Sequence, residues 1–383
     1  MADTLDSTTT VSAVTITPAG AKKIIKRPRM QIIVNGNTMT ILDGTVTKNG
    51  HYNAAEFKGS VSPWLLGLDF WVTLGLDQQK VSVVVQRGEE SEDGSDISWD
   101  TVFDGILDEV EIEADQGKVS LECRDRIALL IDRKIYKAYP NKTAAEIITE
   151  LCKEVGITVN IQGGKTLAGT LYARDHTNVK QGEFSQVQTY WDLICKLAQA
   201  TNNVVQMDGT TLTVMPNEAD TSNPWLVNFS PPVLSNGNIV ALPHANVKKL
   251  SISHKLLATK DILVRVKSFH SKTGKGYAVT SGNKGKVQNQ TVYEYYYPNL
   301  MPDEAQKKAD EIYLEKTSHE LVITVTASAN WNVTPYRTAK IVGAPSLSDL
   351  FYVDHVSWTM SFDGGAEMTV TLKNHPQLNE TSA

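Results

Sequence analysis

Short runs rich in Val, Ile and Thr, separated by Gly, Asn and Asp, recur along most of this chain and constrain its fold more than any other feature. Within "ILDEVEIEADQGKVSLEC", the apolar residues Val110 and Ile112 alternate with glutamates, and the alternation resumes after the turn at 115–117. This period of two is typical of strands that bury one face. Several such strands close together predict a β-sandwich or barrel between Met30 and about Ile131.

The stretch from 137 to 246 interrupts the β pattern with helical signals. In "NKTAAEIITELCKEVGI" the pair Thr143 and Glu146 has capping-box spacing and precedes apolar residues at helical spacing. "SQVQTYWDLICKLAQA" repeats this logic with Ser185 and Gln188, and "NVVQMDGTTLTVM" is typical of a hairpin that turns at Asp-Gly. The stretch therefore predicts a small α+β unit.

After this stretch the β pattern returns, with one helix in "PDEAQKKADEIYLEKTSH" and a closing hairpin in "FYVDHVSWTMSFDGGAEMTVTLKN". The predicted architecture is mainly β, with two similar β units flanking an α+β insertion. The expected parts are a flexible basic N-terminal segment at 1–29, a first β domain at 30–136, an α+β middle domain at 137–246, a second β domain with one helix at 247–376, and a tail at 377–383.

Composition excludes several classes of protein. A net charge of -6 argues against a general nucleic-acid binder, so we expect protein partners. The three cysteines are far apart and lie in apolar patterns, which indicates small core residues in a reducing cytoplasm. The most hydrophobic stretch, "WLLGLDFWVTLGL", is too short to span a bilayer and contains Asp69, so no membrane insertion is expected.

Motifs of enzymes are missing from the sequence. There is no HxxxH, GxSxG, Walker loop or GxGxxG at a strand-helix junction. We therefore expect no enzyme activity, no cofactor, and no catalytic, cofactor-binding or metal-ligating residue. A pair of carboxylates for glycoside hydrolysis stays open, because the separation of acidic side chains in space cannot be read from the sequence.

Charge is distributed unevenly along the chain. The segment from Gly88 to Asp115 is acidic and has no Lys or Arg, whereas Lys248 to Gln288 is basic with Asp261 as its one acidic residue. If the two β units met head to tail in a ring, the two edges could pair between copies. Two solvated faces that never meet would explain the same pattern. The candidate inter-subunit residues are Glu89, Glu90, Glu92 and Asp93 on one edge and Arg265, Lys267, Lys272 and Lys275 on the other.

The alternating glutamates Glu109, Glu111 and Glu113 suggest a second hypothesis. In a ring with an open centre, an acidic lumen would repel a passing polyanion, so these residues are candidates for lining a channel. Ordinary solvent exposure explains the alternation equally well.

The segment "VFDGILDEVEIEADQGKVSLECRDRIALLIDRK" resembles the end of the first β domain in phage tail baseplate hub proteins. This is the late control protein D family, which includes proteins similar to the T-even phage baseplate hub and resembles the N-terminal part of type VI secretion spike proteins. The residues that carry the resemblance are Gly105, Asp108, Asp125, Arg126, Leu129 and Asp132. The helical segments and the closing hairpin are also similar to this family, over about 30 to 375.

This resemblance implies two tube-like β-barrel domains per chain and a homotrimer whose six such domains form a pseudo-sixfold ring. The ring would adapt a sixfold tail tube to a threefold central spike and form part of a delivery channel. The implied partners are the tail tube protein, the spike protein, other baseplate proteins and the tape measure protein, with DNA only in passage. The implied location is the virion tail baseplate, assembled in the host bacterial cytoplasm, with spike and lysozyme domains on separate chains because no room remains for them after residue 375.

The apolar loop "SPWLLGLDFWVTLGLD" would then be a candidate partner-docking element, with Trp64, Phe70 and Trp71 as anchors. Core packing is the competing interpretation. Two alternative functions also stay open: a carbohydrate-binding or cell-wall hydrolytic β protein, and a tail tube protein, although tube proteins usually lack an α+β insertion.

Overall fold

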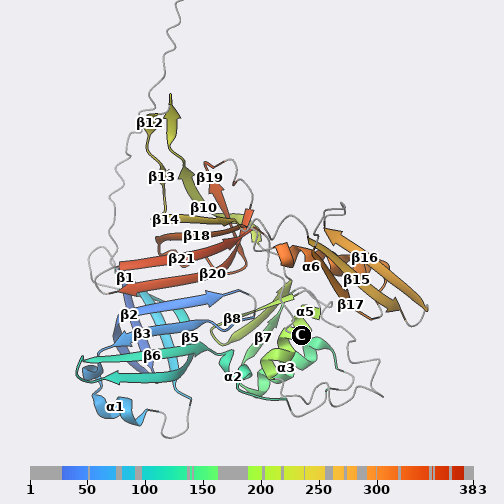
Figure 1. Cartoon of the computed structure of the whole chain (residues 1–383). Helices are drawn as coiled ribbons and strands as arrows, with labels where there is room; N and C mark the ends of the chain where they lie inside the picture. Colours follow the sequence, from blue (N-terminus) through green and yellow to red (C-terminus); the bar gives the residue numbers. More distant parts are fainter. Residues whose placement is uncertain are drawn as a thin grey trace, which may run out of the picture.

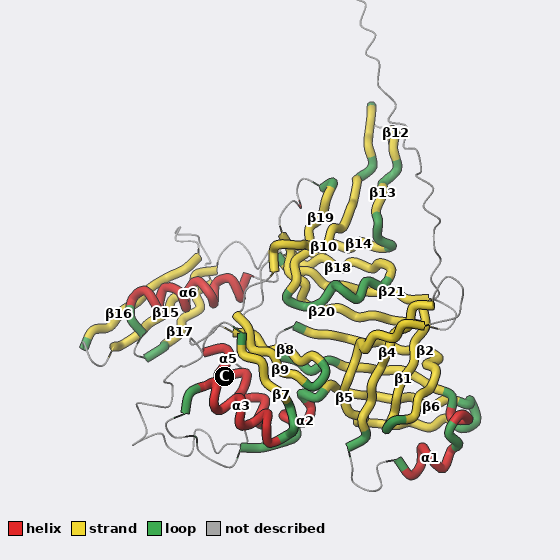
Figure 2. The backbone as a smooth tube through the Cα atoms, turned by 180° about the vertical axis from the view of Figure 1, so that it is seen from behind, coloured by secondary structure: helices red, strands yellow, loops and turns green. Residues whose placement is uncertain are grey.

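The computed structural model shows a β-rich chain in which strands of both β units join one 13-stranded sheet (Figures 1 and 2). The residues that the structure describes are 28–50, 52–74, 80–90, 97–135, 139, 142–162, 189–200, 203–216, 220–236, 238–254, 262–270, 274–282, 291–298, 300–317, 321–344, 347, 350–361 and 365–374.

The first β unit is a closed six-stranded barrel. Its hydrogen-bonded order is β1-β4-β5-β6-β3-β2, and β2 pairs again with β1 to close the circuit. The strands are β1 (Pro28–Val34), β2 (Asn37–Asn49), β3 (Glu56–Val61), β4 (Ser82–Glu90), β5 (Ile97–Glu113) and β6 (Lys118–Asp125). A 3-10 helix, η1 (Pro63–Leu65), and a short helix, α1 (Leu68–Thr73), lie between β3 and β4 at one end of the molecule (Figure 1).

The second β unit joins the barrel through one long strand. The first part of β2 pairs with β1, and its second part, Asp43 to Asn49, pairs with β20 instead. From β20 the sheet continues to β19, β10 and β13 in one direction and to β21, β18 and β14 in the other. These strands are β10 (Asp220–Ser230), β13 (His244–Ala245), β14 (Lys249–His254), β18 (Leu321–Ser328), β19 (Arg337–Val342), β20 (Leu350–Ser361) and β21 (Gly365–Lys373).

One hydrophobic core lies behind both parts of this sheet. Phe57 and Val46 of the barrel belong to the same cluster of buried side chains as Trp358 and Phe351 of the second unit. The Trp358 ring stacks on Trp331, with ring centroids 5.1 Å apart. The two β units are therefore packed as one body.

The α+β unit has its own core, in which helices cover a three-stranded sheet of order β7-β9-β8. Its elements are α2 (Ala128–Ile131), α3 (Ala144–Glu154), β7 (Thr158–Ile161), α5 (Tyr190–Ala200), β8 (Asn203–Asp208) and β9 (Thr211–Pro216). The predicted capping box at Thr143 and Glu146 is present at the start of α3. The pair Ser185 and Gln188 lies outside the described residues, and at the start of α5 the Thr189 hydroxyl accepts the Asp192 N–H instead.

The elements between residues 262 and 317 have a hydrophobic core of their own, apart from the core of the second β unit. The sheet β16-β15-β17 packs against α6 through Val264, Val266, Ala305 and Ala309. The elements are β15 (Ile262–His270), β16 (Lys275–Gly282), β17 (Thr291–Tyr296) and α6 (Pro302–Thr317). Sequence patterns grouped this unit with the second β domain, because its strands have the same alternation.

A two-stranded sheet, β11 (Val233–Ser235) with β12 (Asn238–Ala241), projects beyond β10 and β13 at the end of the molecule opposite to α1 (Figures 1 and 2). The predicted fold class, mainly β with an α+β insertion, is confirmed. Within the described residues, however, the first β unit closes on itself, whereas the pairings of the second run from β14 to β13 without closing. The predicted domain boundaries stay a prediction.

Candidate functional site: a polar sheet face and the joint beside it

The face of the 13-stranded sheet that points away from the core carries one continuous polar surface, here called the polar sheet face. Directly opposed residues of antiparallel strands lie on the same face, so the registers trace rows of side chains across the sheet. Two adjacent rows cross from the first β unit to the second: Glu109, Glu122, Lys58, Thr45, Thr359 and Glu367, and beside them Arg124, Glu56, Thr47, Ser357, Thr369 and Thr326.

Hydroxyl pairs lie where the two β units meet. The Oγ1 atoms of Thr45 and Thr359 are 3.1 Å apart, and Oγ1 of Thr47 is 3.4 Å from Oγ of Ser357. Sequence reasoning missed these residues, although Thr and Ser alternate with apolar residues in both strands and gave a usable signal. The centre of the polar sheet face therefore consists of short, uncharged side chains.

Carboxylates gather toward the β5 end of this face. Glu109 lies directly opposite Glu122, an arrangement of like charges that is destabilising by itself. Lys58 donates to Glu122 at 2.8 Å, and this hydrogen bond, with Glu56 and Glu109 nearby, raises the lysine pKa.

The predicted channel-lining residues lie on this same surface. Glu111 pairs with Ser120 and Glu113 with Lys118, so both share the face of Glu109. Acidic and hydroxyl side chains thus form one surface that spans both β units. That it lines a channel stays a prediction.

The family-like motif forms a network at the end of the barrel. Asp108 is the extra residue at a bulge between Leu107 and Glu109, where β5 and β6 shift register. It accepts two hydrogen bonds from the Arg124 guanidinium, at 2.6 and 2.8 Å. Such bidentate pairs fix geometry as well as charge. Arg124 was not singled out in the sequence, because alternation gives no sign of a bulge.

The remaining motif residues lie close to this pair. Asp132 follows α2 and lies 3.6 Å from Arg124 and 3.3 Å from Lys80. Gly105 pairs with Asp125, and a Cβ atom added to it would come within 2.2 Å of the Arg124 carbonyl oxygen. Only glycine permits this approach of the backbones. Leu129 is half-buried on α2.

Asp125 is the most deeply buried carboxylate of the motif, at 6% exposure. Its Oδ2 accepts the Ala55 N–H at 2.8 Å, and its Oδ1 accepts the Ile127 N–H at 2.9 Å. Burial raises its pKa to about 7, although these two hydrogen bonds and the nearby Lys48 favour the charged form. Asp125 therefore joins the end of β6 to the residue that precedes β3 and to the turn that leads into α2.

Tyr52 joins the barrel to the α+β unit. Its hydroxyl donates to the Asn203 carbonyl, and its own carbonyl accepts the Trp191 indole N–H at 2.8 Å. A third contact is an ion pair between Arg126, in the turn before α2, and Asp104 of β5, with 2.8 Å between the guanidinium nitrogen and the carboxylate oxygen. We call these contacts the barrel joint.

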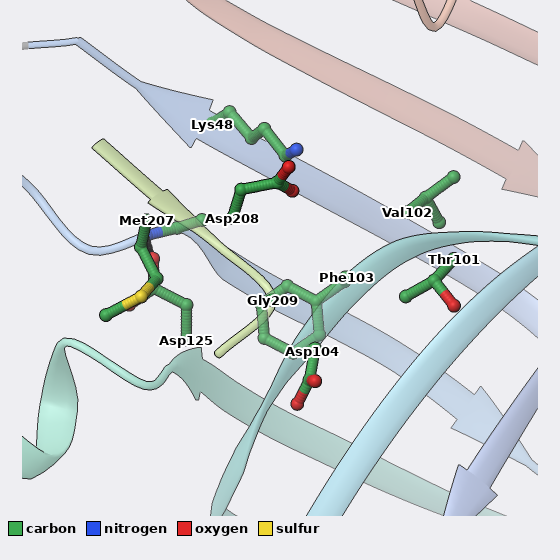
Figure 3. Close-up of a pocket in the computed structure, with 10 residues that line it drawn as sticks. Lys48, Thr101, Val102, Phe103, Asp104, Asp125, Met207, Asp208 and Gly209 are labelled. Carbon is green, nitrogen blue, oxygen red and sulfur yellow. Dashed lines mark hydrogen bonds between the residues drawn. The ribbon is translucent and has the colours of Figure 1, made fainter. Parts of the chain in front are cut away.

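A small pocket lies at the barrel joint between the barrel and the β8–β9 turn (Figure 3). Lys48, Asp104 and Asp125 line it from the barrel, and Asp208 and Gly209 line it from the turn. Its free volume of about 30 Å³ has room for about two water molecules, too little for an organic substrate.

The predicted charge edges are only partly described. For Glu89 and Glu90 the structure describes the backbone in β4, and Glu92, Asp93 and Lys272 lie outside the described residues. Arg265 and Lys267 both pair with Glu294 of β17 in the same chain, Arg265 at 3.6 Å. Lys275 is exposed at the start of β16. Glu294 thus neutralises part of the basic edge.

The predicted docking residues divide into two kinds. Trp71 is 3% exposed and belongs to the shared core, with Phe70 packed edge-on against it at 5.1 Å between ring centroids. Trp64 is 62% exposed. Trp71 and Phe70 therefore have a packing role, and Trp64 is the residue of the three that a partner could reach.

Other kinds of site were also searched. Among the described residues, no group of His, Cys, Asp and Glu side chains is arranged to hold a metal ion. Within those same ranges, no helix is both long and apolar enough to cross a bilayer. The three cysteines are free thiols, two of them buried and Cys195 half-buried.

Comparison with solved structures finds proteins that have a similar fold but a low sequence identity. The chain resembles a tail protein from Neisseria meningitidis, at 13% identity and a TM-score of 0.65, over 91% of this chain and 96% of that one. It also resembles the 43 kDa tail protein of prophage MuSo2 from Shewanella oneidensis, at 12% identity and a TM-score of 0.64, over 90% and 98%. A chain of the Francisella PdpA–VgrG complex matches at 10% identity and a TM-score of 0.55, over 94% of this chain and 60% of that one.

At the sequence level the comparisons are weaker. No curated protein matches the chain. A family profile described as the Alg8 N-terminal domain matches residues 90–240, less than half of the chain. This range begins at the last residue of β4 and ends inside β12, so it follows no structural unit and assigns no family. The structural likeness does show the fold: this chain has the fold of phage tail proteins and of part of a VgrG complex, as its sequence predicted.

Proposed function

We propose that this chain is a structural component of a phage or phage-like tail, and that it forms the baseplate hub. Three copies would make a ring in which six β units surround a channel. The ring would connect a sixfold tail tube to a threefold spike. Its work is mechanical, so it needs no catalytic residue.

The observation that carries this proposal is the polar sheet face. Because β2 pairs with both β1 and β20, the barrel and the second sheet present one uninterrupted wall to solvent. Hydroxyl groups lie at its centre and carboxylates at its β5 end. The cations of this face lie beside carboxylates: Lys58 pairs with Glu122, Arg124 pairs with Asp108, and Lys118 lies opposite Glu113. Such a wall suits a channel through which DNA passes without binding.

The fold likeness supports the class of protein. Two of the similar structures are tail proteins that match this chain over nearly their whole length. The α+β unit between the β units distinguishes a hub from a simple tube subunit. A tube protein would also polymerise without a fixed number of copies, whereas a hub would stop at a closed ring.

The pairing of acidic and basic edges between copies remains part of the proposal, with Lys275 as the basic residue to test. Since Arg265 and Lys267 are paired with Glu294, their exchange for glutamates would break contacts within the chain as well as between chains. Lys275→Glu is the sharper variant, because Lys275 is exposed at the edge of its sheet.

The experiment that tests the proposal is the mass and outline of the purified protein. Three chains of 42.1 kDa give about 126 kDa. Native mass spectrometry should show this trimer, and negative-stain images should show a ring with a central hole and a sixfold outline. Pull-downs with the tube and spike chains would follow. A monomer in every condition, including with those chains present, would refute the hub, and an open-ended polymer would indicate a tube protein.

A further inference from the structure

The segment between Asp220 and Lys248 has an unusual composition. It contains no Asp, Glu, Lys or Arg. Its strands β10 and β13 end the 13-stranded sheet, and β11 and β12 extend from them as a separate two-stranded sheet. We call residues 230–245 the arm.

The arm exposes apolar side chains that nothing within the described chain covers. Val233, Ile239, Val240 and Leu242 are all exposed, and Leu242 reaches 79%. A two-stranded sheet is marginally stable in water by itself. A projecting, uncharged and apolar pair of strands therefore needs a partner surface.

A second exposed apolar surface lies at the opposite end of the molecule. The short helix α1 lies at that end (Figure 1). Trp64 and Leu65 of η1, which precedes α1, and Val72 of α1 are exposed. We call these three residues the η1–α1 patch. The neighbouring Asp69 is the one charged residue between Lys58 and Asp77. Two apolar surfaces of low charge thus lie at opposite ends of the folded molecule.

These ends are related to the sheet in a specific way. Across the sheet, the strand order runs from β5 and β6 through β2 and β20 to β10. The η1–α1 patch lies beyond the barrel end of this order, and the arm lies beyond the β10 end (Figures 1 and 2). A ring built head to tail uses two different surfaces of each subunit, one meeting the other on the next copy.

We propose that the arm of one copy docks on the η1–α1 patch of the next copy and latches the ring. This inference rests on the proposed function, because it assigns the contact between neighbouring subunits. The occupant is a second copy of this chain, since both surfaces lie on every copy and neither carries the charge that a strongly charged partner would require. Leu242 and Val240 insert beside Trp64, which is the aromatic anchor.

The first test uses charged substitutions. The Val240→Asp/Leu242→Asp variant should shift the protein from trimer to monomer in native mass spectrometry at a concentration where the unchanged chain is trimeric. The matched control is Tyr296→Asp on β17, because Tyr296 is 63% exposed but lies outside both surfaces. Circular dichroism of each variant shows whether the chain is folded. Arm variants that remain trimeric would overturn the latch and leave the hub intact. An unchanged chain that never self-associates would refute the hub and the latch together.

The second test is a cross-link, which does not depend on disrupting the interface. One copy carries Leu242→Cys and another carries Trp64→Cys, and the two are mixed and treated with a short bismaleimide. Burial raises the pKa of the thiols of Cys123, Cys152 and Cys195, which lowers the fraction of reactive thiolate at each of them. Cross-linked dimers should form with this pair and not when Phe269→Cys replaces Trp64→Cys. Equal cross-linking of both pairs would overturn the proposal.

Discussion

The two β units of this molecule are made from the same kind of strand but end differently. The first closes into a barrel, in which every strand has a partner on both sides. The second runs from β14 to β13 and, within the described residues, stays open. Closure removes strand edges, whereas an open sheet must cover its edges or pair them with another chain. The barrel therefore pairs all its strand edges within one chain, whereas the second unit leaves its outer strands β14 and β13 without a second partner among the described strands.

The barrel and the second sheet nevertheless share one core, and the largest expected effect tests this sharing. Phe57→Ala in the barrel and Phe351→Ala in the second sheet each remove a fully buried ring. Each should lower the free energy of unfolding by about 3–5 kcal/mol. Because the core is continuous, both variants should unfold in one transition, followed by far-UV circular dichroism and tryptophan fluorescence. Separate transitions for the two units would contradict the shared core.

Asp125, which lines the pocket at the barrel joint, should make the stability of the protein depend on pH. Folded Asp125 holds its proton up to a pH near 7, whereas the unfolded chain releases it near pH 4. Between these values the folded state binds more protons, so this residue makes the free energy of unfolding fall as the pH rises, by about 1.4 kcal/mol per unit at most.

Chemical denaturation between pH 4 and 7 checks this prediction. The Asp125→Asn variant should lose this downward contribution, so its stability relative to the unchanged chain should improve as the pH rises. Asp100→Asn, which removes one exposed carboxylate of β5, is the matched control. Parallel pH profiles of the Asp125→Asn variant and the unchanged chain would show that the joint does not hold a protonated carboxyl.

Barrel closure near the motif should be sensitive to a single methyl group. Gly105→Ala would place a Cβ within 2.2 Å of the Arg124 carbonyl oxygen, and the strands β5 and β6 would have to separate. We expect a loss of about 1–3 kcal/mol. The control is Gly276→Ala in β16, where the nearest atom would be 4.0 Å away and the change should stay within about 0.5 kcal/mol. Equal stability of the two variants in a thermal melt would refute the close approach.

The smallest expected effect concerns the seam between the two β units. Thr45→Val and Thr359→Val each remove one hydroxyl of the pair that bridges β2 and β20. A double-mutant cycle should give a coupling of about 0.2–1 kcal/mol. The pair Thr47 and Thr369, which lie on strands that are not neighbours, should give none, and comparable coupling in both cycles would argue against a direct contact at the seam.

The sequence predicted the local elements well and their long-range partners poorly. The capping box at Thr143 is visible in the sequence because its interactions are only three residues apart. The seam between Thr45 and Thr359 is not, because alternation reports which face a residue occupies but not which strand lies beside it. The same limit applies to barrel closure, since the strands of the closed and the open unit alternate alike.

In the candidate site, too, the sequence indicated which face a side chain occupies but not which residues lie beside it. The alternation of Glu109, Glu111 and Glu113 indicated that they share one face, as the strand register shows. Trp71, a docking candidate in the sequence, is instead buried in the shared core, in line with the competing interpretation. The role of Arg124 was missed, because a bulge turns Asp108 toward it. The pairing of Arg265 and Lys267 with Glu294 was missed as well, because it depends on a parallel strand reached through a long connection.

The central claim is that the polar sheet face lines a channel, and a cryo-electron microscopy map of the assembled ring tests it most directly. The account predicts that Thr45, Thr359 and Glu109 face the central hole in all three copies, with the seam between β2 and β20 on the inner wall. A ring in which this face points outward, and another surface of the chain surrounds the hole, would contradict it.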